Sequence, residues 1–473
     1  MIRATTILVL AALAGGCAVG PAYRPPAPPS GAEAPLVSVN PAAESVAAPP
    51  DDWWRLYEDP RLDGYLREAF AANADLEVAE ANLSAARAVL EAARAGAYPQ
   101  TRAETAAIYG RDPITNEIVE ILGAKARTTW LFDDILDVSY ELDLFGRVRR
   151  SIEASRADAQ AAAAARDDLK VTIAAETTRA YAQVCALGEE IAVARRSLDV
   201  VGREAEITAR RHEAGASTEF DLVRAQGLVA QVRSTIPALE GQRRSALFEL
   251  TEILGRTPQQ APVEAEACVD PPRLKSLIPV GDGAMLLQRR PDVRQADRRL
   301  AAATARIGVA VADLYPRITL SGFYGGAAPD TAGLTAERGL IWGVGPSIAW
   351  TFPNQAAPRA RVRQAKAAAA GALAGFDSAV LQALKETEKA LATYGSELDR
   401  RGDLALAQDR ARKGFEIARG QFLAGSLPNL DLLTSEQTLI AADAAVAASD
   451  SALVQDQISL FKALGGGWRA AQR

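Results

Sequence analysis

The second half of this 473-residue chain repeats its first half. Four pairs of matching positions mark the repeat: Asp75 with Asp292, Tyr98-Pro99 with Tyr315-Pro316, Gly215–Leu222 with Gly425–Leu432, and Leu254-Gly255 with Leu464-Gly465. From the glycine-led segments onward the two halves keep the same spacing, so no insertion separates them there. A duplication this regular means that two copies of one structural unit build the architecture. It is typical of a conduit or a scaffold rather than an enzyme.

Each copy has the same order of helical patterns. The first copy covers about 53–255 and the second about 283–465, with a proline-containing linker at 256–282 and a tail at 466–473. The predicted helices fall at about 62–96, 147–213 and 219–254 in the first copy, and at about 283–313, 357–424 and 428–464 in the second. At 1.5 Å per residue, the longest helices reach about 100 Å.

Alternating apolar and polar residues predict four strands, at about 99–111, 128–145, 316–326 and 340–352. In the second of them Trp130, Val138 and Tyr140 share one parity, while Asp133 and Asp137 share the other. Such alternation fits either a half-buried sheet in a soluble domain or the wall of a transmembrane barrel. The residues that share the apolar parity include tryptophan, which favours the barrel. Because bacterial barrels have at least about eight strands, a chain with four must oligomerise.

The N-terminus has the pattern of a bacterial lipoprotein signal. Residues 1–16 contain Arg3, an apolar run and three small residues, and Cys17 follows directly. We expect cleavage before Cys17, lipidation of its thiol, and an extended, proline-rich tether over 17–52. Ala18 stands where an aspartate would retain a lipoprotein at the inner membrane, so the expected location is the outer membrane. After the signal, no stretch is expected to reach the roughly 18 apolar residues of a spanning helix.

Composition and motifs exclude several function classes. The net charge of -6 and the pI of about 5.3 leave no basic footprint for nucleic acid. The sequence has no P-loop, metal-ligand cluster or catalytic constellation, so neither a cofactor nor a metal is expected. The single histidine, His212, is expected to be solvated or to fill a helix seam. Cys185 and Cys268 could pair in an oxidising compartment, but two buried free thiols are the expectation.

Several motifs together resemble one family: Gly16-Cys-Ala-Val-Gly-Pro21, Trp53-Trp54, Asp75-Leu76, Glu141-Leu-Asp-Leu-Phe-Gly-Arg147, Arg289-Arg-Pro-Asp-Val293 and both glycine-led turns. Over essentially its whole length the chain resembles the TolC-like outer-membrane efflux factors, and specifically the NodT-type lipoproteins. The resemblance implies a mainly α-helical chain with a small β part. It implies a homotrimer whose 12-stranded outer-membrane β-barrel continues into a helical periplasmic tube. It also implies passive export of drugs or other toxic small molecules, with an inner-membrane transporter and a periplasmic adaptor protein as partners.

The two glycine-led turns are the expected sites of function, since they lie about 100 Å of helix from the strands. The family docks its adaptors at this end, and the contact candidates are Gly215, Ala216, Ser217, Gly425, Ser426 and Leu427. In a trimer, an inward carboxylate near a turn becomes a ring of three charges that can narrow the entrance. The gate candidates are Asp431, Glu436, Asp221 and Arg224, with Asp431 preferred. Such a helix-end acid can equally serve only the helix dipole.

Thr218 and Pro428, near the turns, are expected only to restart helices. Thr218 and Asp221 have the spacing of a capping box, and Pro428 suits the first turn of the equivalent helix. The heptad-like spacing that follows both turns requires partner helices. This leaves one alternative for the whole chain, a lipid-tethered periplasmic coiled-coil scaffold that conducts nothing. The strand parity discriminates, because a scaffold has no reason to oppose a tryptophan-rich face to a polar one.

Overall fold

The computed structural model describes residues 18–45, 47–111, 121, 128–274 and 276–466. They divide into two compact units. The strand unit comprises the described residues up to Ala27 together with Asn82–Ala162 and Ala296–Phe376. The helical unit comprises Pro28–Ala81, Ala163–Gln295 and the described residues from Asp377 onward. The signal segment 1–16, the lipidation candidate Cys17 and most of the tail lie outside the described residues.

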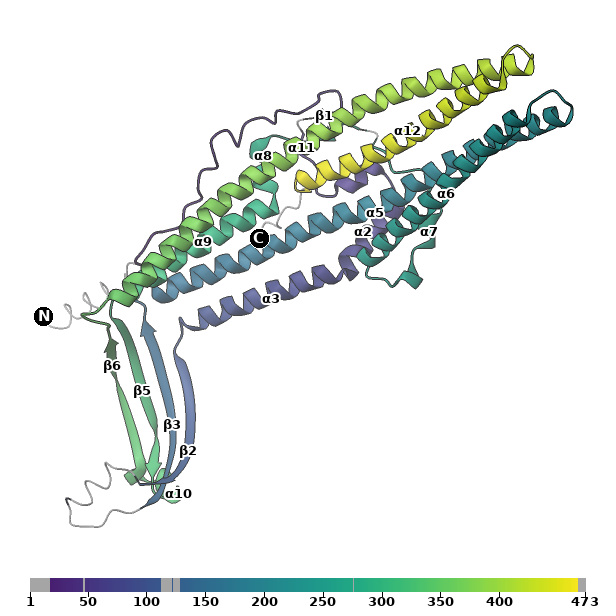
Figure 1. The fold of residues 1–473 in the computed structure, drawn as a ribbon. Coiled ribbons are helices and arrows are strands. Elements are labelled where there is room, and N and C mark those ends of the chain that lie inside the picture. The colour runs from purple at the N-terminus through teal and green to yellow at the C-terminus, as the bar shows by residue number, and fades with distance from the viewer. Residues whose placement is uncertain (1–17, 46, 112–120, 122–127, 275, 467–473) are drawn as a thin grey trace. The chain divides into compact units, whose positions relative to one another are not determined.

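The strand unit contains one antiparallel sheet of four strands (Figure 1). The strands are β2 (Gln100–Gly110), β3 (Thr129–Leu142), β5 (Arg317–Ala328) and β6 (Leu340–Ala349), in the order β2-β3-β5-β6. Each repeat therefore contributes one pair of neighbouring strands, and β3 and β5 join the two repeats, with Tyr140 opposite Leu320. β2 and β6 are the edges of this sheet.

The register gives the sheet two different faces. Because side chains alternate along a strand and directly paired residues share a face, the pairings assign each residue to one side. One face is largely apolar and includes Trp130, Phe132, Leu136, Val138, Tyr140, Leu320, Tyr324, Trp342, Val344 and Ile348. The other face includes Arg102, Glu104, Asp133, Asp137, Glu141, Arg317, Thr319 and Ser321. Trp342, Val344 and Ile348 are 68%, 73% and 68% exposed, so nothing within the described chain covers this part of the apolar face.

The long helices come in two matched pairs (Figure 1). In the first repeat α5 (Arg147–Glu213) has 67 residues and α6 (Glu219–Ile253) has 35. In the second repeat α11 (Ala356–Leu423) has 68 residues and α12 (Asn429–Ala463) has 35. α6 is continuous through Pro237. The predominance of helix over a small β part confirms the predicted fold class.

Two of the predicted helices are each divided in two by the structure. The 62–96 helix is α2 (Pro60–Ala72) followed by α3 (Ala74–Ala95), with the extended residue Asn73 between them. The 283–313 helix is α8 (Gly283–Arg289) followed by α9 (Pro291–Ala312), with Arg290 extended. Pro291 disfavours helical geometry in the residue before it, which explains the second break. Asn73 accepts from the backbone of Leu76 and so begins α3 as a cap.

The core of the helical unit is built around aromatic residues that precede α2. Trp53 is fully buried and stacks on Phe461 of α12 at 4.7 Å between ring centroids. Tyr181 of α5 is also fully buried, and its hydroxyl donates to Asp59 at 2.7 Å. The Trp53-Trp54 and Asp59-Pro60 segment therefore packs against helices of both repeats, α5 from the first and α12 from the second.

The N-terminal segment that was predicted to be an extended tether packs locally against the protein in each unit. In the strand unit the backbone of Val19 donates to Phe145 at 3.1 Å, and Gly20 crosses Gly308 so closely that a side chain at Gly20 would meet backbone. In the helical unit β1 (Glu44–Ser45) pairs in parallel with β4 (Ile278–Pro279). Proline content predicted an extended segment correctly, but the small residues that allow close packing gave no periodic signal.

The expectation of no further apolar stretch was wrong for α11. An 18-residue window of this helix has a mean hydropathy of 1.3, and 17% of that window is buried. By length and composition alone this window could cross a membrane, but a single helix of this kind does not identify a membrane span. The stretch 367–384 is rich in alanine, which also allows helix backbones to approach closely.

The expectation of two free thiols was also wrong, because Cys185 and Cys268 form a disulfide. It links the middle of α5 to the linker between the repeats, which contains the short helix α7 (Val263–Glu266). Arg243 of α6 holds the linker in place by donating to the carbonyl of Cys268 at 2.6 Å and to that of Val184 at 3.1 Å. Gly188 leaves the space that this approach requires, since a side chain there would meet the Cys268 carbonyl.

Candidate functional site: the two hairpin tips

Both long hairpins turn through the same backbone motif. Gly215 and Gly425 have φ angles of 73° and 77°, a left-handed conformation that glycine adopts without strain. The backbone amide of Gly215 donates to the carbonyl of His212 at 2.9 Å, and the amide of Ala216 donates to the carbonyl of Arg211 at 2.7 Å. Gly425 and Ser426 make the equivalent bonds at 3.0 and 2.9 Å. This is the Schellman motif, which ends α5 and α11 and satisfies their last carbonyls.

The first hairpin tip, residues 214–218, is followed by a complete capping box. Thr218 Oγ1 accepts from the backbone of Asp221 at 3.1 Å, and the Asp221 carboxylate accepts from the backbone of Thr218 at 3.2 Å. Asp221 also accepts from the hydroxyls of Thr218 and Ser217. These bonds, the Thr218 hydroxyl first, lower the pKa of Asp221 below its usual value. His212 Nδ1 lies 3.1 Å from the carbonyl oxygen of Ser217, so the lone histidine belongs to the turn.

The second hairpin tip, residues 424–428, is held by fewer bonds. Pro428 is the N-cap of α12, whereas the sequence predicted it within the first helical turn. No side chain caps the helix there. Ser426 Oγ donates back to the Gln421 carbonyl at 3.1 Å. The two tips therefore share a backbone shape but differ in how firmly the returning helix begins.

The six contact candidates are divided by exposure. Gly215, Ala216, Gly425 and Ser426 are exposed, while Ser217 and Leu427 are half-buried. Ser217 is engaged with Asp221, and Leu427 packs beside the apolar cluster formed by Phe415, Phe422 and Leu432.

The structure separates the four gate candidates. Asp221 is committed to the capping box, and the Arg224 guanidinium lies 5.4 Å from the centre of the Phe220 ring on the same helix. Asp431 is exposed in the first turn of α12. Glu436, in contrast, is buried among α5, α11 and α12, which the sequence did not predict.

Two residues near Glu436 escaped the sequence reasoning. Glu204 of α5 is buried, and Arg419 of α11 donates from Nε to its Oε1 at 3.0 Å. They lie 215 residues apart, on helices of different repeats. Glu204 lies in a charged part of α5, between Arg203 and Glu206, so nothing in the sequence singled it out.

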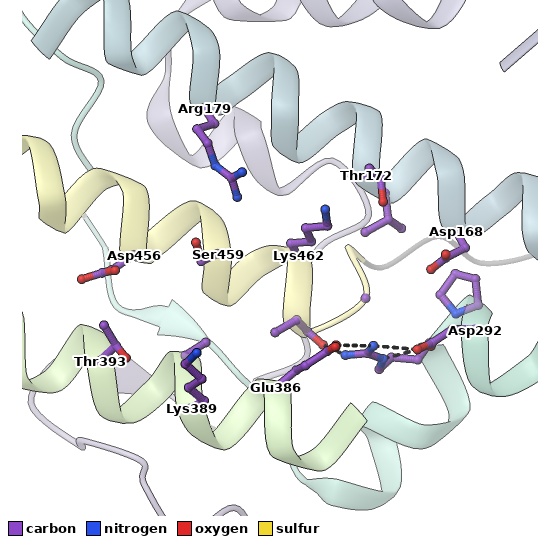
Figure 2. Close-up of a pocket in the computed structure, with 16 residues that line it drawn as sticks. Asp168, Thr172, Arg179, Asp292, Glu386, Lys389, Thr393, Asp456, Ser459 and Lys462 are labelled. Carbon is purple, nitrogen blue, oxygen red and sulfur yellow. Dashed lines mark hydrogen bonds and ion pairs between the residues drawn. The ribbon is translucent and has the colours of Figure 1, made fainter. Parts of the chain in front are cut away.

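A polar cavity of about 560 Å³ lies elsewhere in the helical unit, between α5, α11, α12 and the α8–α9 joint (Figure 2). Basic and acidic side chains line it in similar numbers, including Arg179, Lys389, Lys462, Asp168 and Asp456. This mixture selects no ligand charge. Among the described residues, no three His, Cys, Asp or Glu side chains are grouped so as to hold a metal ion.

The wall of this cavity explains the Arg289–Val293 motif. Arg290 is buried and makes ion pairs with Asp292 at 2.6 Å and Glu386 at 2.8 Å (Figure 2). It also donates to the carbonyl of Ala463, at the end of α12, at 2.7 Å. The motif is thus a structural joint that ties α9 to α11 and α12.

A sheet with one exposed apolar face and one polar face, combined with duplicated long helical hairpins, defines an outer-membrane channel subunit. The outer membrane efflux protein family model matches residues 65–256 and 284–466, once per repeat. The chain belongs to this family, and it is an outer-membrane channel component of an efflux system. The family consists of channel proteins rather than enzymes.

Individual relatives agree with this assignment. The pyoverdine export outer membrane protein OpmQ of Pseudomonas putida is 30% identical over 468 residues, covering 94% of this chain and 93% of OpmQ. Nodulation protein T of Rhizobium leguminosarum bv. viciae is 28% identical, covering 98% of this chain and 93% of that protein. The solved outer-membrane channel OprN has a TM-score of 0.88 and 33% identity, covering 96% of this chain and 100% of OprN. The predicted resemblance and outer-membrane location are confirmed.

Proposed function

We propose that three copies of the chain form one channel, which serves as the outer-membrane component of a tripartite pump and conducts small molecules passively to the exterior. The observation that carries the proposal is the open sheet. β2 and β6 each have one neighbour in the described chain, and an unpaired strand edge in a membrane is costly. Three sheets joined edge to edge give 12 strands and leave no edge.

The faces of the sheet support the same arrangement. The apolar face, with Trp130, Trp342 and Val344, suits lipid, and the face with Asp133, Asp137 and Arg317 suits a water-filled lumen. A soluble scaffold would have to bury the apolar face against other parts of the protein. The apolar window of α11 then serves contact between neighbouring helices in the trimer.

The partners are proposed from the position of the tips along the helices. Four residues separate the end of β3 from the start of α5, which extends about 100 Å to the first tip, so the tips are the periplasmic end of the channel. A periplasmic adaptor protein and an inner-membrane transporter meet the channel there. The exposed Gly215, Ala216, Gly425 and Ser426 provide the primary contacts, with Ser217 and Leu427 supporting the turns.

Lipidation of Cys17 is proposed from the signal motif. The adjoining structure fits an anchor close to the sheet, because Gly146, just after β3, leaves room for the backbone of Ala18. Replacing Cys17 with serine should abolish acylation, measured by mass spectrometry of the purified protein, while leaving the fold unchanged by circular dichroism. Acylation of the serine variant would contradict the proposal.

Asp431 is proposed to narrow the entrance, since it is exposed in the first turn of α12. A trimer would place three such carboxylates around one axis, which raises the local cation concentration. The Asp431→Ala variant should conduct more and select cations less in a planar bilayer. Unchanged conductance and selectivity would remove Asp431 from the gate.

The exported compound is proposed only as a class. A relative exports pyoverdine, a small molecule, and a passive channel distinguishes compounds by size and charge alone. Selection among small molecules is left to the transporter.

The test is the mass and the conductance of one purified sample. The mature protein in detergent should have the mass of three chains and should produce discrete ion currents in a planar bilayer. A monomer without current, after acylation has been verified, would favour the lipid-tethered scaffold instead.

A further inference from the structure

Glu436 occupies an unusual position for a carboxylate. It is 1% exposed, and both of its carboxylate oxygens are buried without a hydrogen-bond partner. It lies one turn beyond Leu432 and Leu433, which belong to two apolar clusters on either side of it. An ionised carboxylate that has left water without gaining a partner is strongly destabilising, whereas the protonated form is tolerated.

The charged groups that face Glu436 do not compensate its charge. α5 contributes Glu204, which is 3% exposed, and α11 contributes Arg419, which is exposed and already bonded to Glu204. α6 contributes Ala225, Leu228 and Val232 to the adjoining cluster. The positive charge of Arg419 is thus shared between two buried carboxylates, those of Glu204 and Glu436. Burial first, and then the Glu204 charge, raise the pKa of Glu436 to about 7, and Arg419 opposes this rise.

We infer that Glu436 is a proton-binding site that couples the packing of α12 against α5 and α11, near the second hairpin tip, to the pH of the periplasm. Protonated Glu436 fits the apolar seam, and ionised Glu436 favours separation of the helices, which hydrates it. The inference rests on the proposed function, because that proposal makes this end of the hairpins the entrance of the channel.

The direction of the effect follows from the two pKa values. In the packed state the pKa is about 7, and in the separated, hydrated state it returns to the ordinary value of about 4.3. A group whose pKa is raised in the packed state stabilises packing fully below about 4.3 and loses that contribution as the pH rises through about 7. Alkaline conditions therefore open the entrance, and the opening equilibrium per chain changes by at most about five hundredfold, the factor that corresponds to the difference between the two pKa values.

The experiment compares Glu436→Gln with Glu416→Gln. Glutamine stands for permanently protonated glutamate, and Glu416 is an exposed residue of α11 that provides the same change of charge outside the seam. Open probability in planar bilayers is measured between about pH 5.5 and 8.5. The wild type and Glu416→Gln should open increasingly with pH, whereas Glu436→Gln should stay at its low value throughout. A Glu436→Gln channel that keeps the wild-type pH dependence overturns the inference.

A second readout does not depend on current. Relative to the wild type, Glu436→Gln should raise the midpoint of thermal unfolding at both pH values, and by more at about pH 8.5 than at about pH 5.5, because the cost of burying Glu436 grows as the pH rises from about 4.3 to about 7. The conservative Glu204→Gln change, which removes the neighbouring charge, should move the pH midpoint of the wild-type transition downward. An equal effect of Glu436→Gln at both pH values overturns the inference.

The outcomes distinguish this inference from the proposed function. A trimer whose normal current is independent of pH contradicts the proton coupling and leaves the channel intact. A protein that is monomeric and silent at every pH contradicts the proposed function and, with it, any coupling to an entrance. If the protein is a trimer but carries no current at any pH, the comparison of thermal midpoints at the two pH values tests the proton coupling instead.

Discussion

The two repeats make the same joint with different chemistry. In the first, Asn73 Nδ2 donates to the carbonyl of Ile253 at 3.2 Å, and in the second Arg290 Nη1 donates to the equivalent carbonyl, Ala463, at 2.7 Å. Gly255 and Gly465, at the ends of α6 and α12, both have positive φ and touch the same joint. The geometry is therefore set by the backbone of the repeat, and the side chain that completes it is free to differ.

The difference has a structural consequence. A neutral amide at Asn73 needs no counter-charge, whereas the buried guanidinium of Arg290 is paired with Asp292 and Glu386 and so ties α11 to the joint. The first repeat also has a covalent fastening, the Cys185–Cys268 disulfide between α5 and the linker. The covalent fastening thus lies in the first repeat and the buried Arg290 joint in the second.

The largest expected effect comes from removing the covalent fastening. The disulfide closes a sequence separation of 83 residues, and its loss in the Cys185→Ala/Cys268→Ala variant should destabilise the protein by about 4 kcal/mol. The thermal unfolding of the purified protein should shift accordingly, and reduction of the wild type should reproduce the shift. Limited proteolysis should then cut the linker at 256–282 before any other segment. A variant with unchanged stability and an intact linker would mean that Arg243 alone holds the linker.

A smaller effect is expected from breaking the ion pairs of Arg290 with Asp292 and Glu386. Arg290→Ala leaves Asp292 and Glu386 without their common partner and should cost about 3 kcal/mol, since breaking a buried ion pair is more costly than losing a neutral bond. The matched Asn73→Ala change in the first repeat loses the bond to Ile253 and the cap on α3, and should cost about 2 kcal/mol. Chemical unfolding at one pH measures both. Equal losses for the two variants would show that only the shared carbonyl contact matters.

Much of the fold could be predicted because it depends on local signals. The turn glycines at 215 and 425 require positive φ, and the strand alternation matches the faces that the register assigns. The break at Arg290 was missed although Pro291 is a local signal for it, and the break at Asn73 was missed because no proline or glycine marks it. The packed N-terminal segment was missed because it depends on close contact between Gly20 and Gly308, 288 residues apart in the sequence.

The site was predictable in position but not in detail. The turns follow from glycine and the Thr218–Asp221 spacing, so the tips could be placed from the sequence alone. Glu436 was chosen for its charge near a turn, and its burial depends on α5 and α11, which meet it only in three dimensions. The pairing of Glu204 with Arg419 and that of Cys185 with Cys268 are likewise tertiary contacts, which residue spacing does not encode.

The smallest effect is expected at the tips, where the repeats differ only in capping. Thr218→Ala removes the acceptor for the Asp221 amide and should destabilise the start of α6 by about 1 kcal/mol, whereas Pro428→Ala removes no side-chain bond and should cost only a few tenths. Hydrogen exchange at the peptide level should therefore quicken at 219–222 in the first variant and change little at 429–432 in the second.

The pH dependence of the first tip sharpens this last comparison. The folded-state pKa of Asp221 is lowered, so its contribution to the capping box is present above the ordinary aspartate pKa of about 3.9 and is lost as the pH falls through the lowered value. After correction for the intrinsic exchange rate, protection at 219–222 should be constant at neutral pH and fall in strong acid, while protection at 429–432 should show no such step. An acid step of equal size at both tips would mean that Asp221 does not distinguish them, and that the shared Schellman backbone alone sets the stability of each turn.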